Sequence, residues 1–148
     1  GIEVVSVAER LPDGLFERFR DARKAMGMTI YATDEPDLMR KLTDDVRSGR
    51  LVCLLADRDI SGKGAQVTWP TGNRSTMPPG PALLARLSGA DLRVTTTHFQ
   101  RSAVLLTVSD TVDTAGGAAA TTQRLADRFG AAIAADPGNW LALQPLVR

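Results

Sequence analysis

The feature that most constrains the fold is an unbroken apolar run over residues 51–56, LVCLLA, which ends abruptly in Asp57-Arg58-Asp59. A continuous apolar run bounded by turn residues predicts a strand that is buried on both faces, as in a parallel sheet. In open α/β sheets, ligands bind just beyond the carboxyl ends of such strands. Two carboxylates and a guanidinium at that end, followed by a glycine-containing loop over residues 61–64, therefore mark the candidate functional site.

The other segments alternate between strand-like and helix-like patterns. We predict strands over residues 3–8, 28–32, 51–56, 65–69, 92–99 and 103–108, and helices over residues 14–26, 33–48, 81–88 and 114–135. The opening order of strand, helix, strand, helix and strand favours α/β layering with parallel pairing, and the short connection at 100–102 favours a hairpin. The predicted fold class is α/β, with a mixed, partly parallel central sheet flanked by helices, in one domain over residues 1–148.

Composition excludes several classes of function. The net charge is only +1, from 18 basic and 17 acidic residues, and aromatic residues make up 5% of the chain, so nothing indicates a nucleic-acid-binding protein. The single cysteine, Cys53, cannot form an internal disulfide, and its apolar neighbours predict a buried structural thiol. No stretch approaches the roughly 20 apolar residues of a membrane span. Because the chain begins at Gly1 directly on a strand-like segment, we expect it to be a piece of a longer protein.

The acidic pair after the apolar run has two interpretations. Asp57 and Asp59 are two residues apart, so in an extended chain their side chains point the same way and Arg58 points oppositely. One carboxylate can orient a histidine base that comes from elsewhere, as the third member of a catalytic triad does. Alternatively, the segment is an ion-paired strand end in which Asp59 caps the following loop.

Two turns near this segment have similar alternatives. The loop at 61–64 places the ammonium of Lys63 beside glycine N–H groups, which suits a phosphate, but it does not match the phosphate-binding loop pattern and also fits a plain turn. The Met-Pro-Pro-Gly-Pro turn at 77–81 precedes a helix, where backbone N–H groups can meet an anion. A rigid turn that only sets the shape is the alternative.

His98 is the only histidine, so any internal catalytic base would have to be this residue. It lies late in a Thr-rich strand, on the same face as Thr96, with no nucleophile pattern nearby. One histidine and one cysteine provide no recognisable cluster of metal ligands. We therefore expect no metal cofactor and no catalytic role for His98.

Several ordered motifs resemble one known family. These are the segment from Leu54 to Gly64, the Met-Pro-Pro-Gly-Pro turn, Gly89-Ala90, and a tail that reads D-P-G-N-W-L-A-L-Q-P over residues 136–145. Together they are similar to the C-terminal half of the lysophospholipid acyltransferase superfamily, in its lipid A biosynthesis acyltransferase branch. Within that branch, the phosphatidylinositol mannoside acyltransferases are the nearest group. The match extends over nearly the whole chain.

The resemblance implies transfer of a fatty acyl chain from acyl-CoA to a sugar hydroxyl of a membrane glycolipid of the phosphatidylinositol mannoside type. In that family the histidine of an H-x-x-x-x-D/E motif is the general base, and an acidic residue at the position of Asp57 lies beside it. The phosphatidylinositol mannoside members usually have Glu at this position. The resemblance makes Asp57 the candidate catalytic residue. The candidate substrate-binding residues are Arg58, Asp59, Lys63, Arg74, Pro79 and Gly80. Acyl-CoA is a donor substrate, and no cofactor is expected.

The sequence departs from the family pattern in two places. No H-x-x-x-x-D/E motif occurs in it, and the resemblance places that motif upstream of Gly1, so we expect the isolated chain to be inactive. Where the family has Phe-Phe-Gly after the short strand, this chain has Pro70-Thr71-Gly72, and Thr76 replaces an arginine before Met-Pro.

These departures leave other functions open. One alternative is a non-catalytic module that binds acyl-CoA or lipid, and another is a structural fragment that forms a homo-oligomer through an exposed sheet edge. The implied location is the cytoplasmic face of the inner membrane, reached through the missing N-terminal part, with this fragment soluble.

Overall fold

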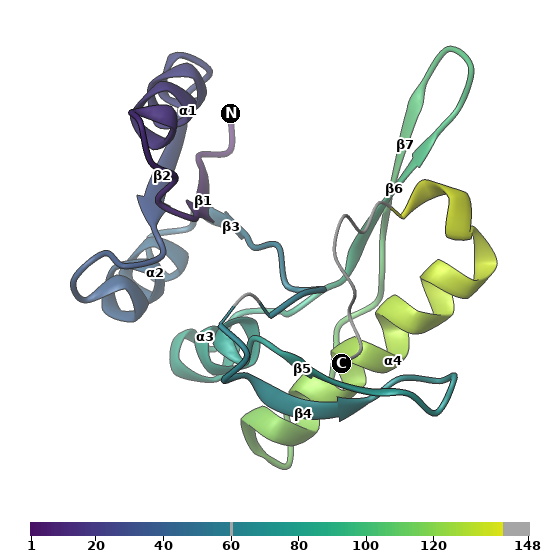
Figure 1. The fold of residues 1–148 in the computed structure, drawn as a ribbon. Helices are drawn as coiled ribbons and strands as arrows, with labels where there is room; N and C mark the ends of the chain where they lie inside the picture. The colour runs from purple at the N-terminus through teal and green to yellow at the C-terminus, as the bar shows by residue number, and fades with distance from the viewer. Residues whose placement is uncertain (60, 141–148) are drawn as a thin grey trace. The chain divides into compact units, whose positions relative to one another are not determined.

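A computed structural model describes residues 1–59 and 61–140 of the chain (Figure 1). The chain divides into two compact units. The first comprises Gly1–Leu55 and Leu87–Ala90, and the second comprises Ala56–Arg86 and the described residues from Asp91 onward. The assignment of the whole chain to one domain stays a prediction.

The first unit is built on a three-stranded parallel sheet with the order β2-β1-β3. Its elements follow the predicted alternation: β1 (Val4–Ala8), α1 (Leu15–Ala25), β2 (Met28–Ala32), α2 (Leu38–Arg47) and β3 (Leu51–Cys53). Each helix connects two strands of the sheet, as parallel pairing requires. The predicted strand–helix alternation with parallel pairing is therefore confirmed.

A polar network fastens α2 to the strands of this unit. The guanidinium of Arg50 forms ion pairs with Asp45 (Nη1 to Oδ1, 2.8 Å) and with Glu3 (Nε to Oε2, 2.7 Å). Asp45 is buried, and burial together with the nearby Asp45 carboxylate raises the pKa of Tyr31 on β2. Because Arg50 precedes β3 and Glu3 precedes β1, the network fixes where these strands begin.

The apolar run does not form the doubly buried central strand that the sequence predicts. Only Leu51–Cys53 is strand, and β3 lies at the edge of the sheet, whereas β1 is central. Leu51 is 50% exposed, Leu55 is 91% exposed, and Cys53 is an exposed free thiol rather than a buried one. The prediction was wrong because an apolar run shows a preference for extended structure but not how many neighbours the strand will have.

The second unit contains the antiparallel pair β4 (Ala65–Thr68) and β5 (Arg74–Met77), covered by the long helix α4 (Gly117–Ala135). A contiguous core joins these elements and consists of Val67, Trp69, Met77, Val94, Val112, Leu125 and Ala126. The side-chain amide of Gln123 on α4 pairs with the main chain of Thr68, accepting from its N–H (2.9 Å) and donating to its carbonyl (2.7 Å). The amide thus takes the place of a neighbouring strand at the β4 edge.

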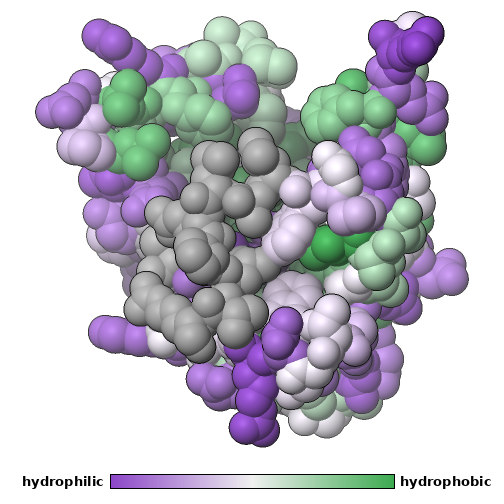
Figure 2. All heavy atoms as spheres, turned by 45° about the vertical axis from the view of Figure 1, so that its right-hand side comes forward, coloured by the Kyte–Doolittle hydropathy of each residue, from purple (hydrophilic) through white to green (hydrophobic). Residues whose placement is uncertain are grey.

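The remaining elements of this unit are a helix, a hairpin and a short turn. The helix α3 (Gly80–Ser88), whose last residues belong to the first unit, follows the Pro-Pro turn. The strands β6 (Thr95–Phe99) and β7 (Val104–Val108) form the predicted antiparallel hairpin, and the 3-10 turn η1 (Pro137–Asn139) follows α4. All five residues of β7 are exposed. Figure 2 shows green apolar side chains on this hairpin, below its hydrophilic tip at the upper right.

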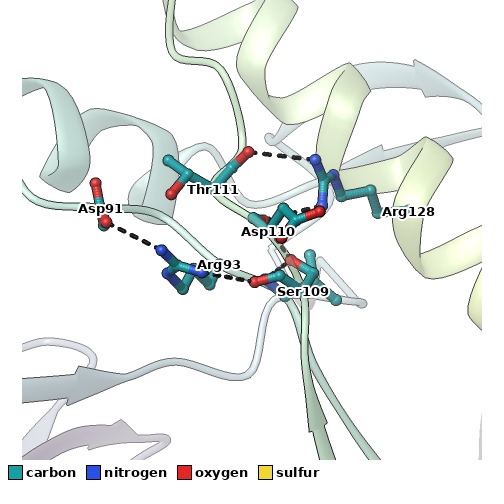
Figure 3. Close-up of polar contacts among 7 residues, drawn as sticks. Asp91, Arg93, Ser109, Asp110, Thr111 and Arg128 are labelled. Atoms are coloured by element: carbon teal, nitrogen blue, oxygen red, sulfur yellow. Dashed lines mark hydrogen bonds and ion pairs between the residues drawn. The ribbon is translucent and has the colours of Figure 1, made fainter.

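Two arginines hold the segment that leads from β7 toward α4 (Figure 3). Arg128 on α4 donates to the main-chain carbonyls of Asp110 (2.9 Å) and Thr111 (3.2 Å). Arg93 donates to the carbonyl of Ser109 (3.0 Å) and pairs with the carboxylate of Asp91 (3.2 Å). Carbonyls that belong to no sheet are thereby satisfied by charged donors, which fixes this irregular segment against the helix.

The fold class is confirmed as α/β with parallel and antiparallel pairing and flanking helices. Among the described residues, the pairing is distributed over three small sheets rather than one mixed sheet. Within the same residues, no helix combines the length and the apolar character needed to cross a bilayer.

Candidate functional site

Asp57, the predicted catalytic residue, lies in the turn region after β3 and is half-buried. Its Oδ2 accepts a hydrogen bond from the indole Nε1 of Trp140, at 2.9 Å. Within residues 1–59 and 61–140, no hydrogen bond reaches the other oxygen, Oδ1. The carboxylate is therefore held through one oxygen by a donor from the tail.

Asp59, only two residues away, has different hydrogen-bond partners from Asp57. Its Oδ1 accepts from the N–H (3.0 Å) and hydroxyl (2.7 Å) of Ser61, and its Oδ2 accepts from the N–H of Gly64 (2.6 Å). Partial burial acts to raise the pKa of Asp59, but hydrogen bonds from Ser61, Gly64 and Thr76 outweigh it and lower the pKa. Asp59 thus caps its own loop, as the second interpretation of the acidic pair proposes.

The close fit around Gly64 explains why a glycine ends this loop. A Cβ at that position would lie 2.7 Å from Oδ2 of Asp59 and would collide with the main-chain carbonyl oxygen of Met77. Met77 is opposite Ala65 in the β4–β5 ladder, so its main chain has little freedom to move away. The loop therefore needs a glycine at this position for close backbone approach.

The other predicted binding residues divide into two groups. Lys63 is exposed on the Asp59-capped loop, which leads into β4. The first residue of β4, Ala65, is opposite Met77, the last residue of β5, and Pro79 and Gly80 follow shortly after Met77. Gly80 begins α3, and the carbonyl of Pro79 accepts from the N–H of Leu83 (3.0 Å). Arg74 is exposed at the opposite end of β5, three residues or roughly 10 Å along the strand.

Arg58 lies between the two acidic residues and is half-buried. No ion pair or hydrogen bond from its guanidinium occurs within the described part of the chain. The structure thus brings Asp57, Arg58, Asp59 and Lys63 into one turn region, next to the segment that begins α3, and leaves Arg74 apart from them.

The ring of His98 is engaged by an acidic residue of the tail. Nδ1 lies 3.0 Å from Oδ2 of Asp136, and Nε2 lies 3.4 Å from the hydroxyl of Thr96. The hydrogen bond from His98, and a second one from Asn139, lower the pKa of Asp136. Because an ionised carboxylate only accepts, Nδ1 is the nitrogen that carries a proton.

Sequence reasoning missed the role of Trp140. The residue was part of a motif used for the resemblance, but nothing assigned it a partner. It is 83 residues from Asp57 along the chain, so no local spacing could join them. The available signal was chemical, since an indole N–H seeks an acceptor when its ring is partly buried.

Comparison with known proteins supports the resemblance. Residues 3–148 match the model of the bacterial lipid A biosynthesis acyltransferase family. The chain is 40% identical over 144 residues to a phosphatidylinositol mannoside acyltransferase of Mycobacterium tuberculosis, covering 95% of this chain and 45% of the relative. A protein of the same name from Mycolicibacterium smegmatis is 38% identical over 144 residues, covering 95% of this chain and 47% of the relative. The chain therefore spans about half the length of the curated relatives that it matches.

Proposed function

The chain belongs to the bacterial lipid A biosynthesis acyltransferase family, and from this premise we propose that it supplies part of the active site of a glycolipid acyltransferase. The reaction moves a fatty acyl chain from acyl-CoA to a sugar hydroxyl of a membrane glycolipid of the phosphatidylinositol mannoside type. The two relatives named as phosphatidylinositol mannoside acyltransferases support the choice of acceptor class.

The observation that supports this function best is the state of Asp57. A carboxylate fixed through Oδ2 and without a hydrogen bond to Oδ1 from the described residues is suited to receive an imidazole N–H. We propose that this imidazole belongs to the histidine of an H-x-x-x-x-D/E segment outside the 148 residues. Asp57 then selects its tautomer and stabilises the imidazolium that forms during the reaction.

The proposed step balances as an ordinary acyl transfer. The imidazole removes the proton of the sugar hydroxyl while the hydroxyl oxygen attacks the thioester carbonyl carbon. A carbon–oxygen bond forms, the carbon–sulfur bond breaks, and the proton passes from the imidazolium to the departing thiolate, which gives free coenzyme A. No metal or redox group is needed to complete these steps.

The positive side chains near Asp57 suit the phosphates that both substrates contain. Arg58 and the exposed Lys63 lie within six residues of Asp57. We propose that these two, with Asp59, Pro79 and Gly80 shaping the turn, contact the donor or the acceptor. Arg74, at the other end of β5, would contact a more distant part of the same substrates.

The experiment is a chimera in which the upstream segment of the Mycolicibacterium smegmatis relative is joined before Gly1. Transfer of labelled acyl groups from acyl-CoA to mannosylated phosphatidylinositol is measured for the chimera and for Asp57→Asn. We expect Asp57→Asn to lower kcat by about 100-fold or more, because the base loses its orienting carboxylate. Asp110→Asn, at an exposed acidic residue of the same unit, is the matched control and should leave kcat unchanged.

Two outcomes would contradict the proposal. A folded chimera that binds acyl-CoA without transferring the acyl group would favour a lipid-binding module instead. Turnover of Asp57→Asn within a factor of two of the unmodified chimera would remove Asp57 from the reaction.

A further inference from the structure

Two side chains of the tail after α4 form hydrogen bonds with the end of β6. The carboxamide of Asn139 accepts from the N–H of Phe99 (2.7 Å) and donates to Oδ2 of Asp136 (2.5 Å). The same Oδ2 receives the hydrogen bond from Nδ1 of His98 (3.0 Å). The side chains of Asp136 and Asn139 thus hold two consecutive residues of β6, and we call these four residues the tail clamp.

The clamp is rigid because its two tail members belong to one tight turn. The N–H of Asn139 donates to the carbonyl of Asp136 (3.2 Å), and that of Trp140 donates to the carbonyl of Pro137 (3.3 Å). Pro137 restricts its own backbone and begins the 3-10 turn between the two clamp residues. The next residue after the turn, Trp140, is in the extended region and is the one whose indole reaches Asp57.

Two hydrogen-bonded junctions therefore meet in consecutive residues of the tail. The first fastens the tail to β6 through Asn139, and the second fastens Asp57 through Trp140. A carboxylate in a turn region with no regular structure of its own would otherwise sample several rotamers. A partly buried indole N–H on a clamped backbone removes that freedom, because it specifies which oxygen of Asp57 is occupied.

We propose that Trp140 is a positioning residue for Asp57 and that the tail clamp of His98, Phe99, Asp136 and Asn139 holds it in place. This inference rests on the proposed function of Asp57. It assigns the only histidine of the chain a purely positional role, since its protonated Nδ1 is already engaged by Asp136. It also gives the spacing of Asp136, Pro137 and Trp140 a physical reason, because Asp136 contacts His98, Pro137 begins the turn and Trp140 contacts Asp57.

The first test uses the 148-residue chain and needs no activity. The chain has two tryptophans, and the indole of Trp69 donates to the hydroxyl of Ser75 (2.7 Å), so the two indole N–H signals in a ¹H–¹⁵N spectrum report on separate contacts. Trp140→Phe assigns the signal of Trp140 by its loss. Asp57→Asn should shift that signal upfield and leave the Trp69 signal in place. Ser75→Ala should shift the Trp69 signal upfield and leave the Trp140 signal in place.

The clamp is tested in the same spectra. Asn139→Ala removes the hydrogen bond to Phe99 of β6 and changes neither Asp57 nor the indole. We expect exchange of the Trp140 indole hydrogen with solvent to become about 3- to 10-fold faster, the change that corresponds to one ordinary hydrogen bond. Exchange of the Trp69 indole hydrogen should stay unchanged. The inference is overturned if the chemical shift of the Trp140 indole signal does not change in Asp57→Asn, or if its exchange rate does not change in Asn139→Ala.

The second test measures the consequence in the chimera described above. Trp140→Phe keeps a six-membered aromatic ring but removes the N–H together with the rest of the pyrrole ring, so we expect kcat to fall about 10-fold, with KM within a factor of two. Combined with Asp57→Asn, it should cause no further loss, because the two residues act as one unit. A merely structural role would instead lower the yield of folded protein and give additive losses.

The outcomes separate the two proposals. Full turnover of Trp140→Phe beside a loss in Asp57→Asn overturns this inference alone. Full turnover of Asp57→Asn overturns the proposed function and this inference with it. Both proposals are supported if the Trp140 indole signal shifts in Asp57→Asn and the loss of kcat in the double variant is non-additive.

Discussion

The Asp59-capped loop offers the sharpest test of the local geometry, through Gly64→Ala. A Cβ at Gly64 meets the main-chain carbonyl of Met77 and lies 2.7 Å from Oδ2 of Asp59. The same glycine donates its N–H to that oxygen at 2.6 Å. The substitution therefore introduces a collision and disturbs the hydrogen bond that the carboxylate makes to the loop.

The magnitude follows from three contributions. Forcing an extra methyl group into a close contact costs about 1–3 kcal/mol. Losing a hydrogen bond to a charged group costs about 1.5–3 kcal/mol. The lower flexibility of alanine in the unfolded chain offsets about 0.4–1 kcal/mol of this. Together, these contributions lead us to expect that Gly64→Ala lowers the free energy of unfolding of the second unit by about 2–5 kcal/mol.

Tryptophan fluorescence in urea measures this change selectively. The only two tryptophans, Trp69 and Trp140, belong to the second unit, so their emission follows the unfolding of that unit. Lys63→Ala, on the exposed side of the same loop, is the matched control and should change the free energy of unfolding by less than about 0.5 kcal/mol. An unchanged urea midpoint for Gly64→Ala would refute the reasoning.

Two further predictions concern the same unit. Alanine is favoured over glycine within a helix by about 1 kcal/mol, yet we expect Gly130→Ala to destabilise by about 1 kcal/mol, because its Cβ would lie 2.5 Å from Cδ of Pro70. Pro70→Ala in that background should recover the urea midpoint, and a higher midpoint for Gly130→Ala alone would contradict the contact. Hydrogen bonds from His98 and Asn139 lower the pKa of Asp136 below its ordinary value of 3.8. The ionised carboxylate therefore stabilises the folded unit above pH 3.8, and this stabilisation is lost as the pH falls below that value. The Trp140 indole signal, followed from pH 5 to pH 2, should therefore change less in Asp136→Asn than in the unmodified chain, and equal changes would count against the clamp.

Local patterns predicted most of the elements correctly. The strand over residues 28–32 was predicted with its observed bounds, and the helix over residues 14–26 differs from α1 by one residue at each end. The hairpin at 100–102 was also predicted correctly, since its turn and its strands are adjacent in sequence. In each case the signal lies within a dozen residues, which is the range over which periodicity and turn residues act.

The errors concern properties that depend on distant segments. The strand β5 was not predicted, because Arg74-Ser75-Thr76 has no apolar alternation and is extended only through its pairing with β4. Likewise, the exposure of Cys53 depends on the position of β3 at the edge of its sheet. Sequence spacing shows which residues can form a strand, whereas the tertiary structure decides which neighbour they receive.

The two acidic residues of the site show how such neighbours divide similar residues into different roles. In sequence, Asp57 and Asp59 are equivalent carboxylates on either side of Arg58, and only the resemblance selected the first. In the structure, both oxygens of Asp59 accept hydrogen bonds from its own loop, so this carboxylate is engaged in holding that loop. Among residues 1–59 and 61–140, Asp57 receives one hydrogen bond, which comes from Trp140 in the tail. The two carboxylates thus differ in their partners, since Asp59 is held by its own loop and Asp57 by a tryptophan 83 residues away, and local spacing predicts only the first of these contacts.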